Sequence, residues 1–150
     1  MVKKGFVKCV SLLMVMVTLL AVPVAAKDIE PEASARSTFF VAYDTYLWKT
    51  STYGFEIWFD ITACETMTEL GVSEIILERS TDGGATWGKL KTFTPDEYPQ
   101  MIEENTFAYE SYVTYMGFPD YQYRAQVTFY AKKSNGSTGE YYATSAPMTL

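Results

Sequence analysis

The alternation of side chains over residues 53–63 constrains the fold more than any other feature of the sequence. Every second side chain in this segment is apolar: Tyr53, Phe55, Ile57, Phe59, Ile61 and Ala63. Glu56, Asp60 and Thr62 lie between them, and Trp58 is the one large apolar side chain on that face. Because successive side chains of a strand point to opposite faces, this period of two predicts a β-strand with one buried face.

The same periodicity recurs along the chain and no helical periodicity accompanies it. Strands are predicted over residues 38–50, 53–63, 72–79, 87–94, 106–116, 121–131 and 140–150. The first strand is expected to break near Asp44. Residues 64–71 are expected to form a loop, and residues 95–105 a long loop or a crossover. Short strands separated by turn signals predict an all-β fold, an antiparallel β-sandwich of about seven strands. The single sandwich domain is expected to span residues 38–150.

Residues 1–26 have the pattern of a secretory signal peptide. Three lysines precede an uncharged apolar run over residues 9–22, and small residues lead to an expected cleavage site after Ala26. An uncleaved membrane anchor is the alternative, but a span needs about 20 apolar residues. We therefore expect a secreted, extracellular protein, in which residues 27–37 form a flexible leader.

Charge and cysteine content restrict the partners of the mature chain. After cleavage nine lysines and arginines face 18 acidic residues, for a net charge of −9. This disfavours nucleic acid and, once the signal is removed, anionic membranes, because both require clustered cations. Cys64 is then the only cysteine, which excludes an internal disulfide. It is expected to be a small buried residue or an interchain bridge, so a monomer or a weak homodimer are both open.

The segment 80–87 is predicted to be a tight β-turn. Asp82 and two glycines lie between alternating segments, which is the composition of a hairpin. Asp82 is therefore expected to organise this turn.

The sequence contains no set of residues suited to known catalytic chemistry. It has no histidine, which excludes Ser-His-Asp and Cys-His catalysis and histidine zinc sites. We predict no catalytic residue, no metal site and no cofactor. A small hydrolase using acidic residues is the enzymatic alternative, because paired carboxylates such as Glu103–Glu104 and Asp96–Glu97 can serve glycoside hydrolysis if two of them converge.

Aromatic side chains on outward faces are the best candidates for ligand contact. Trp58, Trp48 and Tyr130 fall on faces predicted to point outward, where aromatic rings can stack on sugars or anchor a protein. The competing interpretation is that such rings cover the sheet by cross-strand pairing. A carbohydrate-binding module that uses these aromatics is therefore one functional alternative.

Two segments carry resemblances to known families. Residues 121–127, Tyr-Gln-Tyr-Arg-Ala-Gln-Val, resemble the Tyr-x-Tyr-Arg-x-x-Val strand of fibronectin type III modules. The resemblance implies a fibronectin type III-like or immunoglobulin-like sandwich in which Tyr121 or Tyr123 anchors a corner through its hydroxyl. With the signal peptide and the single domain, the chain resembles an uncharacterised family of small secreted proteins from Gram-positive bacteria. Residues 80–87 also resemble the Asp-box through Ser80, Asp82, Gly84 and Trp87. This resemblance implies a structural hairpin in which Trp87 packs near Ile75 or Leu77.

These observations predict a secreted, non-enzymatic β-sandwich that serves as an extracellular binding or structural module. Its expected partner is an extracellular protein or glycan.

Overall fold

The computed structural model describes residues 38–150, which form an all-β fold of seven strands and one 3-10 turn. The elements are β1 (Phe40–Lys49), β2 (Gly54–Ser80), β3 (Gly88–Phe93), η1 (Pro99–Met101), β4 (Ile102–Met116), β5 (Gln122–Lys132), β6 (Thr138–Thr144) and β7 (Met148–Thr149). All strand pairs are antiparallel, which confirms the predicted fold class. The predicted signal peptide (residues 1–26) and leader (residues 27–37) lie outside the described residues.

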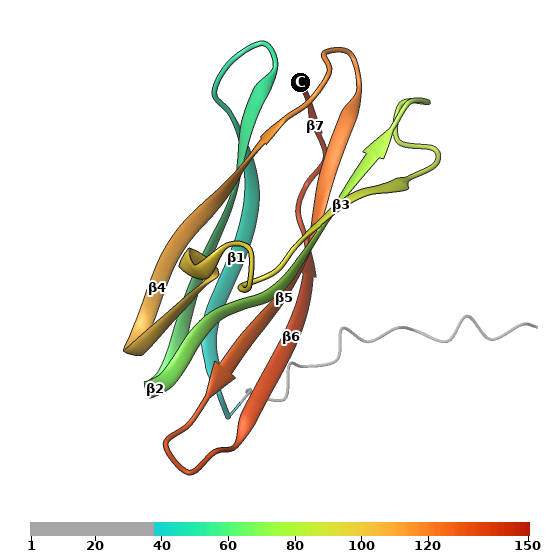
Figure 1. Ribbon diagram of the computed structural model, residues 1–150. Helices are drawn as coiled ribbons and strands as arrows, with labels where there is room; N and C mark the ends of the chain where they lie inside the picture. Colours follow the sequence, from blue (N-terminus) through green and yellow to red (C-terminus); the bar gives the residue numbers. More distant parts are fainter. Residues whose placement is uncertain (1–37) are drawn as a thin grey trace, which may run out of the picture. The chain divides into compact units, whose positions relative to one another are not determined.

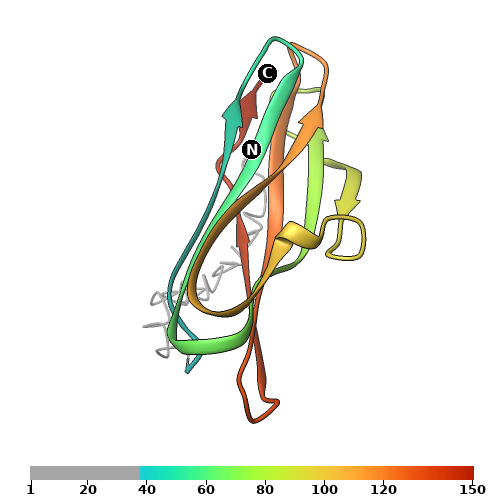
Figure 2. The same cartoon turned by 60° about the vertical axis from the view of Figure 1, so that its left-hand side comes forward.

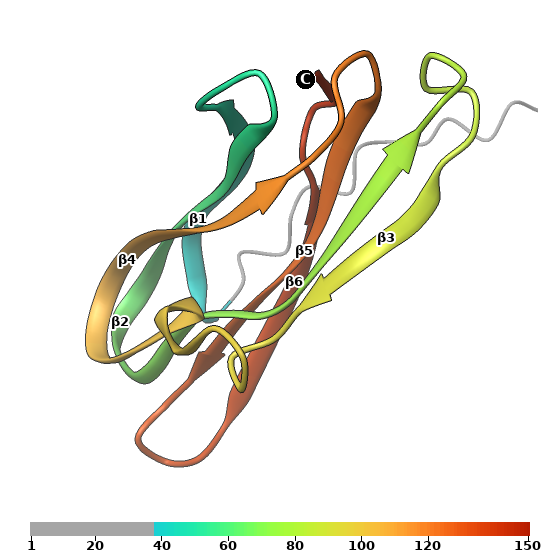
Figure 3. The same cartoon turned by 45° about the horizontal axis from the view of Figure 1, so that its top comes forward.

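The strands form two layers that share β2. The first part of β2 pairs with β1 on one side and with β4 on the other. Its second part pairs with β3 and β5, and β6 and β7 pair with β5. Figure 3 shows β2 running from the layer of β1 and β4 into the layer of β3, β5 and β6. A single curled sheet therefore supplies both layers.

The prediction of a loop at residues 64–71 is wrong, because β2 is continuous through this segment. The chain bends where the register of β2 against β4 shifts, between Thr62 and Met67. Beyond the bend, β2 pairs with the first residues of β4 and the last residues of β5. Figure 2 shows β2 and β4 following the same curve. The polar composition that suggests a loop is that of an exposed strand corner, where the backbone hydrogen bonds go to neighbouring strands.

Gly71 permits a close approach of backbones just after this bend. A Cβ at this position would collide with the backbone carbonyl oxygen of Met101. Glycine is therefore required by the packing of η1 against β2 rather than by a turn.

The core lies between the two layers and is built from the inward side chains of β2, β4 and β5. Ile75, Leu77, Met67 and Leu70 are fully buried. The inward residues of β5 are buried as well, in the order Tyr123, Ala125, Val127, Phe129 and Ala131. Full burial of side chains of this size supplies the hydrophobic stabilisation of the sandwich, at about 25 cal/mol per Å² of apolar surface removed from water.

An aromatic contact joins the edges of the two layers. Tyr43 of β1 and Tyr141 of β6 have ring centroids 4.2 Å apart, and Phe129 lies 5.3 Å from Tyr43. Burial raises the pKa of Tyr43 to about 12, and its hydrogen bond with Tyr141 acts in the same direction. Side chains of β1 and β6 thus meet across the open side of the curled sheet, where the lower ends of the two strands approach each other in Figure 1.

Other predicted boundaries are corrected. β1 has no break at Asp44, and its irregularity falls between Phe40 and Ala42. β4 begins within the predicted loop 95–105. The predicted last strand divides into β6 and β7 around Pro147, because proline cannot donate a hydrogen bond to the sheet. Cys64 is exposed on the bend of β2, so the expectation that it is buried is wrong.

Candidate functional site

The outer face of β1, β2 and β4 carries a row of three aromatic side chains. Tyr46 of β1 lies opposite Trp58 of β2, and Trp58 lies opposite Tyr112 of β4. Trp58 is on the outward side because its neighbours Ile57 and Phe59 fill the core. The strand register therefore brings together three rings that are far apart in the sequence. We call Tyr46, Trp58 and Tyr112 the aromatic row.

The rings of the aromatic row pack against one another. Tyr46 and Trp58 are parallel and stacked with centroids 6.1 Å apart, and the centroids of Trp58 and Tyr112 are 4.6 Å apart. Trp58 therefore has a ring contact toward each neighbouring strand, and its indole nitrogen donates a 2.8 Å hydrogen bond to Glu56. Trp58 is consequently half-buried, whereas Tyr46 and Tyr112 are 42% and 39% exposed. The two tyrosines are therefore exposed in a larger fraction than the tryptophan.

Trp48 is the most accessible tryptophan on this face. It lies opposite Glu56, two residues after Tyr46 on the same face of β1, and is 61% exposed. Among residues 38–150, no ring contact or hydrogen bond involves its indole. Its ring surface is free to contact a ligand.

A row of carboxylates adjoins the aromatic row. Asp44 of β1, Asp60 of β2 and Glu110 of β4 lie directly opposite one another, and all three are exposed. We call Asp44, Asp60 and Glu110 the carboxylate row. Within the described part of the chain, the only salt bridges are formed by Glu65, Glu69 and Glu78.

Tyr130 lies on the other layer, away from Trp48 and Trp58. It is on the outer side of β5, and its hydroxyl donates a 3.1 Å hydrogen bond to Glu69, which also pairs with Lys132 at 2.7 Å. The bond from Lys132 lowers the pKa of Glu69, and burial followed by the bond to Glu69 raises the pKa of Tyr130. Tyr130 therefore belongs to a hydrogen-bonded network in which Lys132 neutralises the charge of Glu69. The three predicted ligand contacts do not form one site.

The segment 80–87 forms a turn held by side chains. Ser80 donates a 2.7 Å hydrogen bond to Asp82 Oδ1 and accepts one from the amide of Gly84 at 2.8 Å. Thr86 donates to Asp82 from both its amide, at 2.9 Å, and its hydroxyl, at 2.6 Å. These bonds, led by the Thr86 hydroxyl, lower the pKa of Asp82 to about 2. Gly84 has a φ of 91°, a conformation that glycine adopts without strain.

Trp87 does not join the core beside Ile75 or Leu77. Its ring lies 4.3 Å from the guanidinium carbon of Arg124, which in turn pairs with Glu78 at 2.6 Å. The hairpin is therefore attached to β5 by a cation–π contact on the outer face.

The hydroxyl of Tyr123 holds the connection between β4 and β5. It accepts a 2.8 Å hydrogen bond from the amide of Phe118 and donates one to the carbonyl of the same residue at 3.1 Å. Tyr123 is fully buried. Tyr121, the other candidate for this role, is half-buried and lies beneath the guanidinium of Arg79, 5.0 Å away.

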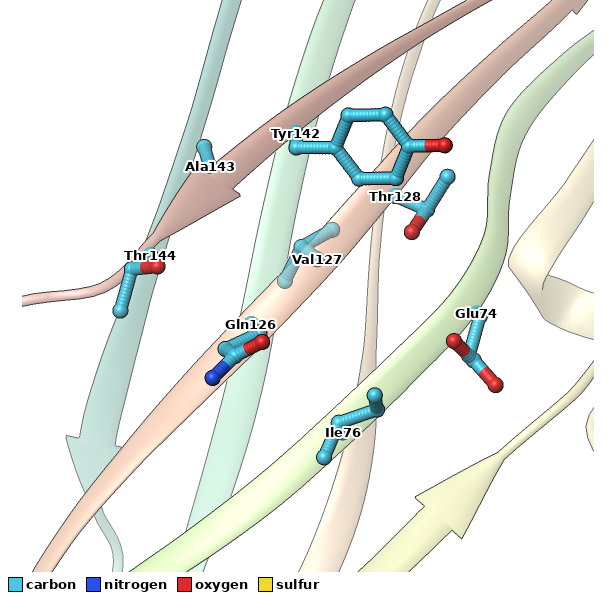
Figure 4. Close-up of a pocket in the computed structure, with 8 residues that line it drawn as sticks. All are labelled: Glu74, Ile76, Gln126, Val127, Thr128, Tyr142, Ala143 and Thr144. Carbon is cyan, nitrogen blue, oxygen red and sulfur yellow. The ribbon is translucent and has the colours of Figure 1, made fainter. Parts of the chain in front are cut away.

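A shallow hollow of about 160 Å³ lies on the outer face of the second layer (Figure 4). Glu74, Thr128 and Tyr142 line one side of it, and Ile76 and Gln126 line the other. The hollow contains a single carboxylate, so it does not present the pair of acidic groups that glycoside hydrolysis requires.

The carboxylates considered for hydrolysis are exposed. Asp96 and Glu97 lie between β3 and η1, and Glu103 and Glu104 lie near the start of β4. In residues 38–150 no group of three acidic or cysteine side chains is placed to hold a metal ion. The same residues contain no helix long and apolar enough to cross a membrane.

Comparison of the chain with protein-family models and with curated proteins finds no match. The geometry of the described residues is therefore the basis for a functional proposal.

Proposed function

We propose that the protein is an extracellular, non-enzymatic binding module with a fibronectin type III-like sandwich, and that it binds through the outer face of β1, β2 and β4. The observation that carries the proposal is the aromatic row with Trp48 beside it. Four aromatic side chains gather on one solvent-facing surface, and exposed aromatics of this kind are enriched where proteins bind partners.

The strand order supports the fibronectin type III-like part of the proposal. In immunoglobulin lettering, β1, the first part of β2 and β4 correspond to strands A, B and E. The second part of β2, β5 and β6 correspond to C, F and G, with β3 added beside C. A tyrosine at the start of strand F that bonds the backbone a few residues upstream accompanies this sandwich, and Tyr123 has that geometry. The turn at residues 80–87 similarly has the side-chain bonds expected of an Asp-box hairpin.

Secretion is part of the same proposal and rests on the signal-peptide pattern of residues 1–26. Amino-terminal sequencing of protein recovered from the culture medium tests it. A mature chain that begins at Lys27 supports secretion, and a full-length chain retained in the cell contradicts it.

Binding through the aromatic face is tested with three probes: a neutral oligosaccharide series, a lysine-rich peptide and an anionic polyglutamate. Binding is measured by calorimetry and mapped by amide chemical shifts. Trp48→Ala is expected to weaken binding of the active probe by about tenfold, the effect of losing one aromatic anchor. Tyr142→Ala is the matched control, because Tyr142 is 70% exposed on the opposite layer.

Absence of binding to all three probes contradicts the proposed surface, as does a shift map confined to β5 and β6. Turnover of a glycoside or peptide substrate that is abolished by substitution of a single carboxylate contradicts the non-enzymatic assignment.

Carbohydrate recognition is the second candidate function. It is favoured by the exposed, uncontacted ring of Trp48, since a free ring face can stack on a sugar. Binding of the neutral oligosaccharide series that is lost in Trp48→Ala and retained in Trp48→Tyr supports it. Retained binding in Trp48→Ala contradicts it.

A further inference from the structure

The two outer faces of the sandwich differ in how they treat their carboxylates. On the layer of β3, β5 and β6, Glu78 pairs with Arg124 and Glu69 pairs with Lys132, whereas Glu74 and Glu140 have no cationic partner among the described residues. On the face of β1, β2 and β4, the carboxylate row and Glu56 have no cationic partner among the described residues. The outward positions of these three strands contain no lysine or arginine.

Repulsion between the charges of the carboxylate row destabilises the folded protein, and no cationic side chain of the described residues relieves it. Like charges directly opposite each other on neighbouring strands are destabilising. Asp60 has a like-charged neighbour on both sides, Asp44 on β1 and Glu110 on β4. A cationic ligand would relieve this repulsion, because each charge that it brings interacts favourably with more than one carboxylate.

The carboxylates are spread over the surface and do not converge on a point. Neighbouring strands lie about 4.8 Å apart, so the row extends across the width of the layer. Residues 38–150 include no group of three acidic or cysteine side chains placed to hold a metal ion. The arrangement therefore fits a ligand whose positive charges are themselves spaced, and does not fit a single metal ion.

The aromatic row lies two residues along each strand from the carboxylate row, about 7 Å away. Lysine and arginine side chains have an apolar stem that covers rings and a charged end that reaches carboxylates. The partly exposed rings of Tyr46 and Tyr112 can also receive a cation over their faces. Lysine or arginine side chains that lie across both rows can therefore cover the aromatic rings with their stems and reach the carboxylates with their charged ends.

We propose that this face binds an extended polypeptide segment rich in lysine and arginine. The carboxylate row and Glu56 pair with its charged ends, while the aromatic row and Trp48 pack against its side-chain stems. The inference rests on the proposed function, since it names the ligand of the same surface.

The test uses a synthetic peptide of alternating lysine and serine, with titration followed by tryptophan fluorescence and calorimetry. The test variant is Asp44→Asn/Asp60→Asn/Glu110→Gln. The control variant, Asp96→Asn/Glu97→Gln/Glu140→Gln, removes three exposed carboxylates that lie outside β1, β2 and β4, and it has the same net charge as the test variant. The test variant is expected to weaken binding about tenfold, and the control about twofold or less.

The test variant is expected to fold, because it removes repulsion between exposed side chains; its melting temperature should equal or exceed that of the wild type. Raising salt from about 20 mM to about 300 mM should weaken wild-type binding, because the ion pairs are exposed. The amide shifts caused by the peptide should map to β1, the first part of β2 and β4. Trp48→Ala alone should also weaken binding of the peptide.

Equal loss of binding in the test and control variants overturns the inference, since attraction by net charge alone then explains it. Binding of a chitosan oligomer but not of the peptide also overturns it, in favour of an amino-polysaccharide. Binding of a neutral oligosaccharide that the test variant leaves unchanged overturns the inference while leaving the proposed function intact. Absence of any ligand on this face removes both.

Discussion

The indole nitrogen of Trp58 donates a 2.8 Å hydrogen bond to Oε2 of Glu56, two residues earlier on the outer face of β2. The bond fixes the indole between the rings of Tyr46 and Tyr112. An aromatic side chain on a solvent-facing strand is thereby held in one orientation. The aromatic row is thus ordered before any ligand arrives, which reduces the entropy lost on binding.

Trp58 is expected to contribute to stability, unlike its exposed neighbour Trp48. Trp58→Ala removes two ring contacts and should lower the free energy of unfolding by about 1–3 kcal/mol. Trp48→Ala removes a 61% exposed ring without ring partners and should change it by less than about 0.5 kcal/mol. Urea unfolding followed by circular dichroism measures both. Equal stability of the two variants would show that the aromatic row is not a packed unit.

The hydroxyl of Tyr123 is expected to stabilise the corner between β4 and β5. Tyr123→Phe leaves the amide and carbonyl of Phe118 without their partner and should cost about 1–3 kcal/mol. Tyr121→Phe is the control, because no hydrogen bond of its hydroxyl is found in residues 38–150. Chemical denaturation of both variants decides the point. A larger loss in Tyr121→Phe would assign the corner to the other tyrosine.

The turn at Asp82 is expected to lose stability in acid. Its folded pKa of about 2 lies below the ordinary value of 3.8, so the charged carboxylate stabilises the folded turn. This contribution is fully present above about pH 3.8 and is lost as the pH falls through 2. An NMR titration should give the low pKa, and amide exchange of Thr86, corrected for intrinsic pH dependence, should accelerate over the same range. In Asp82→Asn the amide exchange should show no such transition; if it does, another group is responsible.

Gly71 is expected to be intolerant of substitution. Gly71→Ala places a Cβ against the carbonyl of Met101 and should destabilise the protein by about 1–3 kcal/mol, the usual range for overpacking. In Gly88→Ala the new Cβ meets only Arg79 O at 3.9 Å, so little change is expected. Thermal unfolding compares the two variants. A neutral Gly71→Ala would mean that η1 does not pack closely against β2.

The strands and their inward faces could be predicted because both depend on local periodicity. The period of two over residues 53–63 and 121–131 identifies the buried side chains directly, and Ile57 and Val127 are buried accordingly. The turn at Ser80 and Asp82 could also be predicted from the sequence, because its hydrogen bonds join residues within four positions of one another.

The continuity of β2 could not be predicted, because a bent strand and a loop have the same polar composition. Cys64 and Glu65 are exposed on the bend, as they would be in a loop. What makes the segment a strand is hydrogen bonding to β4 and β5, which lie more than thirty residues away in the sequence. The predicted packing of Trp87 is wrong for a related reason, since Arg124 comes beside Trp87 only through the pairing of β2 with β5.

The sequence by itself determined the all-β class, the inward faces of the strands and the chemistry of the tight turn, because each depends on neighbours a few residues apart. Only the tertiary structure decided which outward side chains form a surface. Strand register placed Tyr46, Trp58 and Tyr112 in one row and three carboxylates in the next, and it placed Tyr130 on the other layer. Register is set by the packing of the buried faces against each other, so the outward faces inherit their pattern from the core.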